Sequence, residues 1–133
     1  MLAKVITEAV KAVASRPLVV VVDDDPAVCS SLKFSLELEG FAVRTYGGGA
    51  ELLDAGDVAC DCFVVDQRMP GMSGMELIWK LREQKISTPA ILIISHPSDA
   101  LSRRAAKAHI PVIEKPLLGN ALVDTIRQAC NQG

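Results

Sequence analysis

The sequence has little of what marks several large classes of protein. Aromatic residues make up 4% of its 133 residues and the net charge is −2, so no basic face with interleaved aromatics is present to attract nucleic acid. The longest apolar runs, such as Ala90 to Ile94, are far too short to span a membrane. The segment from Met1 to Pro17 contains charged side chains throughout and lacks the apolar stretch of a signal peptide. We therefore expect a cytoplasmic protein without a membrane partner.

The four cysteines lack the spacing of a zinc site or of a disulfide framework. Cys60 and Cys62 flank a single aspartate and lead into an apolar run, and no CxxC or paired histidine accompanies them. A cysteine in a cytosolic protein usually behaves as a small buried hydrophobe. We interpret Cys29, Cys60, Cys62 and Cys130 in this way.

The length fits one compact domain, and the apolar pattern predicts alternating strands and helices. The short strand-like runs are rich in β-branched residues, as in strands that are buried on both faces. We expect right-handed crossovers and a parallel sheet with helices on both sides, which is an α/β fold. The predicted strands span 18–22, 41–46, 62–65, 89–94 and 111–114, and the predicted helices span 26–39, 50–55, 75–84, 98–108 and 119–129.

Two helical patterns add to this core. In the helix predicted over 75–84, Met75, Ile78, Trp79 and Leu81 lie on overlapping faces. Residues 1–17 form an N-terminal extension to a domain spanning 18–133, and their apolar spacing predicts an extra amphipathic helix. That helix could pack on its own domain or form a homodimer contact. Its apolar positions are Leu2, Val5, Ile6, Ala9, Val10 and Val13.

Polar side chains follow four of the five predicted strands. Asp23, Asp24 and Asp25 follow the first, and further polar residues follow the third, fourth and fifth. A single aspartate after a strand is usually a turn former or a helix cap. In parallel α/β sheets, however, ligands bind at the carboxyl ends of the strands, where these residues would converge. The other three residues are Asp66, Ser95 and Lys115.

Such a cluster has a specific chemistry. Several carboxylates in one crevice repel one another, and a hard cation with oxygen ligands, such as Mg²⁺, relieves that repulsion. A carboxylate beside a cation and a lysine is a competent nucleophile toward phosphorus. The pattern therefore predicts phosphoryl chemistry at Asp66, assisted by Ser95 and Lys115.

Three motifs resemble those of response regulator receiver domains, of the chemotaxis-Y-like and nitrogen-fixation-J-like kind. VVVDDDP, from Val20 to Pro26, resembles the acidic motif that opens such domains. DQRMPGMSG, from Asp66 to Gly74, is similar to the family's phosphorylation loop, and Glu114 to Pro116 resembles its lysine-proline end. The resemblance extends from Leu18 to about Gln128. It implies a doubly wound, flavodoxin-like, five-stranded sheet with the strand order 2-1-3-4-5.

The resemblance also implies a role for each matching residue. Asp66 would be the phospho-acceptor and part of the Mg²⁺ site, with Asp24 as the direct ligand, Asp23 acting through water, and the backbone carbonyl of Arg68 completing the protein ligands. Ser95 and Lys115 match the family's hydroxyl and phosphate-binding positions. The Lys115–Pro116 peptide bond is cis in that family. Asp25 is better suited to capping the helix that begins at Pro26.

The sequence departs from the family in several places. Val112 replaces the switching aromatic three residues before Lys115, which puts the usual readout in doubt. The interval from Ser95 to Lys115 is about two residues shorter than usual, and a proline lies near each of its ends. His96 and Arg68 lie beside the predicted site, and either could alter the lifetime of the phosphoryl group or be a plain surface residue.

Two other functions share parts of this pattern. A haloacid-dehalogenase-type phosphohydrolase also uses a DxD aspartate, but only one helix and a single acid, Asp124, follow Lys115. A receiver-fold binding module that has lost phosphorylation is the other alternative, and Val112 makes it worth testing. We favour a two-component phospho-acceptor that is not an enzyme beyond its own phosphorylation and dephosphorylation. Its expected partners are a histidine kinase or phosphotransfer protein and a downstream protein.

Overall fold

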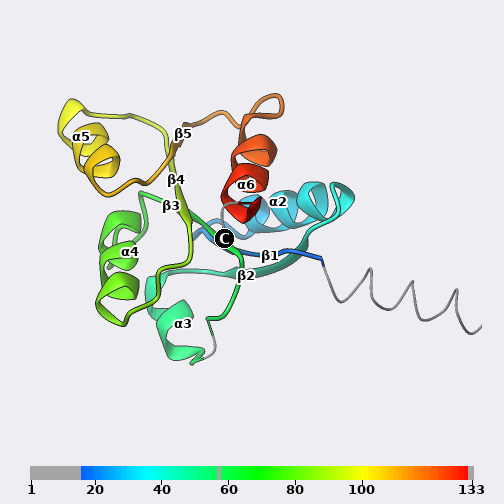
Figure 1. The fold of residues 1–133 in the computed structure, drawn as a ribbon, viewed down its shortest axis with the longest axis horizontal. Helices are drawn as coiled ribbons and strands as arrows, with labels where there is room; N and C mark the ends of the chain where they lie inside the picture. Colours follow the sequence, from blue (N-terminus) through cyan, green and yellow to red (C-terminus); the bar gives the residue numbers. More distant parts are fainter. Residues whose placement is uncertain (1–15, 57, 132–133) are drawn as a thin grey trace, which may run out of the picture.

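The protein forms a five-stranded parallel sheet with helices on both faces (Figure 1). The structure is a computed structural model that describes residues 16–56 and 58–131. The strand order is β2-β1-β3-β4-β5, so the predicted fold class is confirmed. The strands are β1 (Leu18–Val22), β2 (Ala42–Tyr46), β3 (Cys62–Asp66), β4 (Ala90–Ile94) and β5 (Val112–Glu114).

The three central strands are buried on both faces. Every residue of β3 and β4 is buried, and only Leu18 of β1 is partly exposed. Val21 pairs with Val64 and Val64 with Ile91, so the apolar side chains of successive strands are in register. Because both faces must be covered, these strands consist of nearly continuous apolar residues rather than an alternating pattern.

Two helical layers cover the sheet, and in Figure 1 they lie on opposite sides of the strands. Val20, Phe63 and Leu92 belong to one core with residues of α3, α4 and α5, whereas Val21, Val64 and Ile91 belong to the other with residues of α2 and α6. The helices are α2 (Pro26–Leu38), α3 (Gly49–Asp54), α4 (Gly74–Glu83), α5 (Asp99–Lys107) and α6 (Ala121–Asn131).

Side-chain caps fix the starts of three helices. The Asp25 carboxylate accepts a hydrogen bond from the Ala27 amide at the start of α2, where Pro26 occupies the first turn. Ser73 caps α4 and Ser98 caps α5 in the same manner. The cap predicted at Asp25 is therefore present.

The structure corrects the boundaries of the predicted elements. Element boundaries shift by one or two residues; Phe41, for example, is buried before β2 begins rather than within it. The Trp79 side chain is 55% exposed, whereas Met75, Ile78 and Leu81 on the overlapping faces of the same helix are buried. The predicted helix within residues 1–17 lies almost wholly outside the described residues. In the described part of the chain, no helix is long and apolar enough to cross a membrane.

Candidate functional site

The fold brings four of the predicted site residues together at the carboxyl ends of the strands. Asp23 and Asp24 follow β1, Asp66 is the last residue of β3, and Lys115 follows β5. The Lys115 Nζ atom lies 3.3 Å from Asp66 Oδ1 and 3.8 Å from Asp23 Oδ2. One carboxylate oxygen from each of the three aspartates lies within 4.8 Å of the others. Residues that are far apart in sequence thus form one charged cluster.

Burial makes this cluster electrostatically unusual. Asp23 and Asp66 are 4% and 6% exposed, and they are the only buried charged residues in the described part of the chain. Burial raises the pKa of both carboxyl groups, and Lys115 acts in the opposite direction. Asp23 further raises the pKa of Asp66. Lys115 alone therefore does not compensate for two buried carboxylates, and a bound cation would.

Backbone hydrogen bonds hold these side chains in place. The Asp25 amide donates to Asp23 Oδ1 at 2.9 Å, which orients the Asp23 carboxylate. The Lys115 amide donates to the Ile94 carbonyl at 2.7 Å and so ties the residue after β5 to β4. The Lys115–Pro116 peptide bond is cis, as the family resemblance implies.

The loop between β3 and α4 is packed tightly against Asp66. A Cβ atom added to Gly74 would lie 2.6 Å from the Asp66 carbonyl oxygen, so only glycine fits at this position. The Gln67 side-chain oxygen accepts a hydrogen bond from the Met75 amide, and the Gln67 carbonyl accepts one from the Gly74 amide. Sequence reasoning missed this role of Gln67, because many residue types can occupy a loop position and only the fold shows the contact.

The donor set fits the predicted Mg²⁺ ion. Asp23, Asp24 and Asp66 offer only oxygen ligands, and two of the three are buried with their pKa values raised. Oxygen ligands from a few carboxylates are the set that Mg²⁺ prefers. Arg68 is exposed in the loop two residues after Asp66, and the role of its carbonyl remains a prediction.

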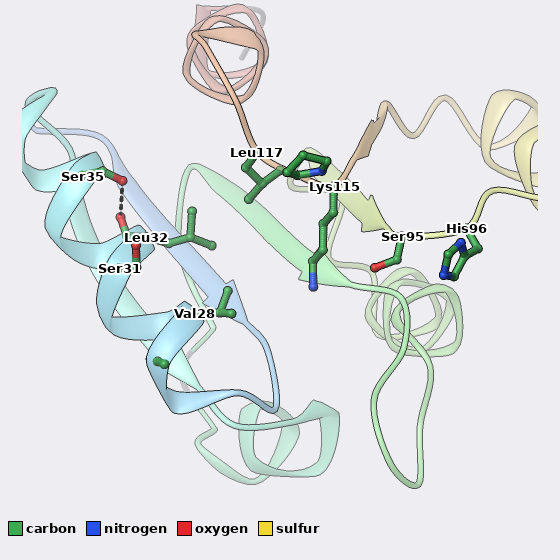
Figure 2. A pocket seen from close by; sticks show the side chains of 10 residues that line it. Val28, Ser31, Leu32, Ser35, Ser95, His96, Lys115 and Leu117 are labelled. Atoms are coloured by element: carbon green, nitrogen blue, oxygen red, sulfur yellow. Dashed lines mark hydrogen bonds between the residues drawn. The ribbon is translucent and has the colours of Figure 1, made fainter.

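Ser95 and His96 lie exposed in the loop after β4, at the rim of a hollow of about 720 Å³. Figure 2 shows Ser95 and His96 on one side of Lys115, with α2 on the other side. The α2 side of this hollow was not predicted from the sequence, although the small side chains of an exposed helix face beside Asp24 are a signal for it. The lining residues are Ala27, Val28, Ser31, Leu32, Ser35, Ser95, His96, Lys115, Pro116 and Leu117.

The structure thus combines a doubly wound parallel sheet with an acidic cluster and a lysine at its strand ends, where α/β sheets bind their ligands. The model of the response regulator receiver domain family matches residues 19–127. The chain belongs to the response regulator receiver domain family. This membership contradicts the haloacid-dehalogenase alternative.

Individual relatives agree with this assignment. The chain is 39% identical over 111 residues to the transcriptional regulatory protein FixJ of Rhizobium meliloti, with 82% of this chain and 54% of that protein covered. It is 37% identical over 113 residues to the C4-dicarboxylate transport transcriptional regulatory protein DctD of Pseudomonas aeruginosa, covering 84% of this chain and 24% of that protein. The chain thus spans about half or less of these two relatives.

Solved structures resemble the fold over most of its length. The crystal structure of FixJ-N matches with a TM-score of 0.80 at 36% identity, covering 90% of this chain and 97% of that one. The receiver domain of the Francisella response regulator 1452 matches with a TM-score of 0.80 at 26% identity, covering 88% of this chain and 98% of that one.

Proposed function

We propose that the protein is a phospho-acceptor switch of a two-component system, with Asp66 as the residue that receives the phosphoryl group. The observation that carries the proposal is the buried Asp66 carboxylate, 3.3 Å from Lys115 Nζ and grouped with the Asp23 and Asp24 oxygens at the sheet edge. Membership of the receiver family supports the same assignment.

The transfer would convert a phosphohistidine of a donor protein into an acyl phosphate. An Asp66 oxygen forms a bond to phosphorus while the phosphorus–nitrogen bond to the donor imidazole breaks, and the imidazole takes up a proton. Lys115 neutralises one phosphoryl oxygen, and the Ser95 hydroxyl donates a hydrogen bond to another. A Mg²⁺ ion held by Asp23, Asp24 and Asp66, with the Arg68 carbonyl as a further ligand, would supply charge neutralisation for the same oxygens.

The hollow beside Lys115 supports a protein as the phosphoryl donor. Val28 and Leu117 give the hollow apolar surface, and Ser31 and Ser35 place small side chains on the adjoining face of α2. A partner helix can therefore approach Asp66 closely. A histidine kinase or phosphotransfer protein is the partner class that this arrangement fits. We further propose that the protein works in the cytoplasm and is not an enzyme in the ordinary sense.

The output of the switch is a second protein or a further domain. The relatives FixJ and DctD are named transcriptional regulatory proteins, and the chain covers only part of each. The acyl phosphate adds charge and acceptor oxygens to the edge of the sheet where the loops after β3, β4 and β5 meet. This change alters the surface that a partner protein binds. Val112 is half-buried in β5 and has no ring to move, so the response would run through those loops.

Mass measurement of the intact protein tests the proposal. The chain is incubated with acetyl phosphate and Mg²⁺, and we expect one phosphoryl adduct on the wild type and none on Asp66→Asn. Chelation of the metal should abolish the adduct. An unmodified wild type would favour the binding module that works without phosphorylation, and an adduct that persists in Asp66→Asn would exclude Asp66 as the acceptor.

A further inference from the structure

Trp79 is a large aromatic side chain that is exposed on α4. It is the single tryptophan of the chain, and 55% of its surface is exposed in the middle of α4, whereas the adjacent Ile78 is buried. Tryptophan is enriched at protein interfaces and often dominates their binding energy. Trp79 lines two hollows. One, of about 340 Å³, lies between α4 and α5, and the other, of about 160 Å³, lies between α4 and the segment after α5.

The charges around the larger hollow are balanced and unpaired. Glu76, Lys80 and Glu83 of α4 and Arg104 of α5 line it together with Trp79. Within residues 16–56 and 58–131, none of these four charged groups forms an ion pair. The patch thus carries two carboxylates and two cations, arranged around one exposed indole ring.

This balance identifies the occupant. A strongly acidic or basic partner would bring two of the four charges against charges of the same sign. A copy of the same patch, turned by a twofold axis, instead brings acids toward bases on both sides of the axis. On α4, Glu76 and Lys80 are one helical turn apart and exposed on the same side as Trp79.

We propose that a second copy of this chain docks on the α4 face, with the two α4 helices antiparallel and Trp79 close to the twofold axis. In this arrangement Glu76 of each copy faces Lys80 of the partner subunit, so the same ion pair forms twice. Packing of the two indole rings supplies most of the affinity, and the charged pairs fix the antiparallel orientation of the two helices. The interface does not involve Asp66, so its test is independent of the proposed phosphorylation.

Sedimentation velocity of the full chain tests the proposal, from about 10 μM to about 1 mM, a range suited to weak association. We expect a reversible monomer–dimer equilibrium with a blue shift of the single-tryptophan emission as dimer forms. Trp79→Ala should weaken association about tenfold or more. Phe34→Ala, which removes another exposed ring from α2, is the matched control and should leave association unchanged. A wild type that stays monomeric, or a dimer unaffected by Trp79→Ala, would overturn the proposal.

A charge exchange tests the antiparallel geometry. Lys80→Glu should weaken the dimer about fivefold, since two carboxylates then face each other twice. The double variant Glu76→Lys with Lys80→Glu should restore the wild-type affinity to within about twofold. Thermal unfolding of each variant verifies that it is folded. If the double variant associates no better than Lys80→Glu alone, the proposed ion pair between Glu76 of one copy and Lys80 of the other is wrong.

Discussion

At the scale of single residues, the acidic cluster links the chemistry of the site to the stability of the protein. Burial and the neighbouring Asp23 carboxylate raise the pKa of Asp66, and the ion pair with Lys115 only partly opposes them. Between the ordinary value of 3.8 and its raised value, native Asp66 binds more protons than unfolded Asp66. This group therefore makes the metal-free protein less stable as the pH rises through that window.

Asp66→Asn should accordingly stabilise the metal-free protein at neutral pH. The substitution removes a buried charge and keeps the shape of the side chain, so we expect its melting temperature to exceed that of the wild type by a few degrees. The difference should shrink as the pH falls below the raised pKa of Asp66. Thermal unfolding in the presence of a chelator measures both effects, and a less stable variant at neutral pH would show that the Lys115 ion pair outweighs the desolvation of Asp66.

Gly74 provides a second prediction at this scale. A Cβ atom there would meet the Asp66 backbone at 2.6 Å, and backbone cannot rotate away as a side chain can. Gly74→Ala should therefore cost about 1–3 kcal/mol of unfolding free energy, as overpacking usually does, and should slow labelling by acetyl phosphate. Gly48→Ala is the control, because nothing lies within 4 Å of its added Cβ. Denaturant unfolding of the two variants should separate them clearly.

At the scale of elements, α2 is the helix whose exposed face borders the hollow beside Lys115. Ser31 lines the hollow beside Lys115, whereas the neighbouring exposed Ser30 does not. Ser31→Trp should fill part of the hollow and reduce phosphotransfer from a phosphohistidine protein about tenfold, a size typical of a disrupted contact at an interface. Labelling by acetyl phosphate should be unchanged, because a small donor does not need the α2 face.

Ser30→Trp is the matched control for this experiment. It adds the same bulk to the same helix outside the hollow, and it should leave both reactions at wild-type rates. Equal loss of transfer in both variants would mean that the donor does not dock along this hollow.

The cap of the same helix carries a separate prediction. The Asp25 carboxylate accepts a hydrogen bond from the Ala27 amide at 2.9 Å and lies at the positive end of the helix dipole. Asp25→Ala should lower the free energy of unfolding by about 1 kcal/mol. It should not weaken Mg²⁺ binding appreciably, since Asp25 is not among the clustered carboxylates. Chemical denaturation and metal titration check the two parts, and a large loss of Mg²⁺ affinity would assign Asp25 to the metal site.

At the scale of the whole molecule, Mg²⁺ should act as a stabilising ligand. An ion that binds only the native state adds about 2.7 kcal/mol at a concentration of 100 times its dissociation constant. We expect thermal unfolding to shift upward with Mg²⁺ in the wild type and to respond much less in Asp24→Asn, which loses a ligand at the exposed side of the cluster. An equal response in both proteins would place the ion elsewhere.

The overall architecture was predictable from the sequence because parallel βαβ topology leaves few alternatives. Runs such as Leu18–Val22 indicated strands buried on both faces, and the rule for strand ends placed Asp23, Asp66 and Lys115 at one edge before any distance was known. The 3.3 Å approach of Lys115 to Asp66 could not be predicted, because it depends on how β5 pairs with β4.

Surface features were harder to predict for a physical reason. Helical periodicity predicts which positions are buried only when apolar residues occupy the buried positions and polar residues occupy the exposed ones. The apolar Trp79 is exposed beside the buried Ile78, so it breaks this pattern. The hollow along α2 combines residues from α2, the loop after β4 and the segment after β5, which only the folded chain brings together. Neither feature has a local sequence signal that is strong enough to identify it alone.

The shortness of β5 has a consequence for the lysine that follows it. This strand has three residues, none of them fully buried, and pairs only with β4 at the edge of the sheet. Edge strands of this kind are the first to fray, so brief detachment of β5 would carry Lys115 away from Asp66 without unfolding the rest of the sheet. Amide hydrogens of β5 should then exchange faster than those of β3, and the frequency of that opening would set how often Asp66 loses its ion pair with Lys115.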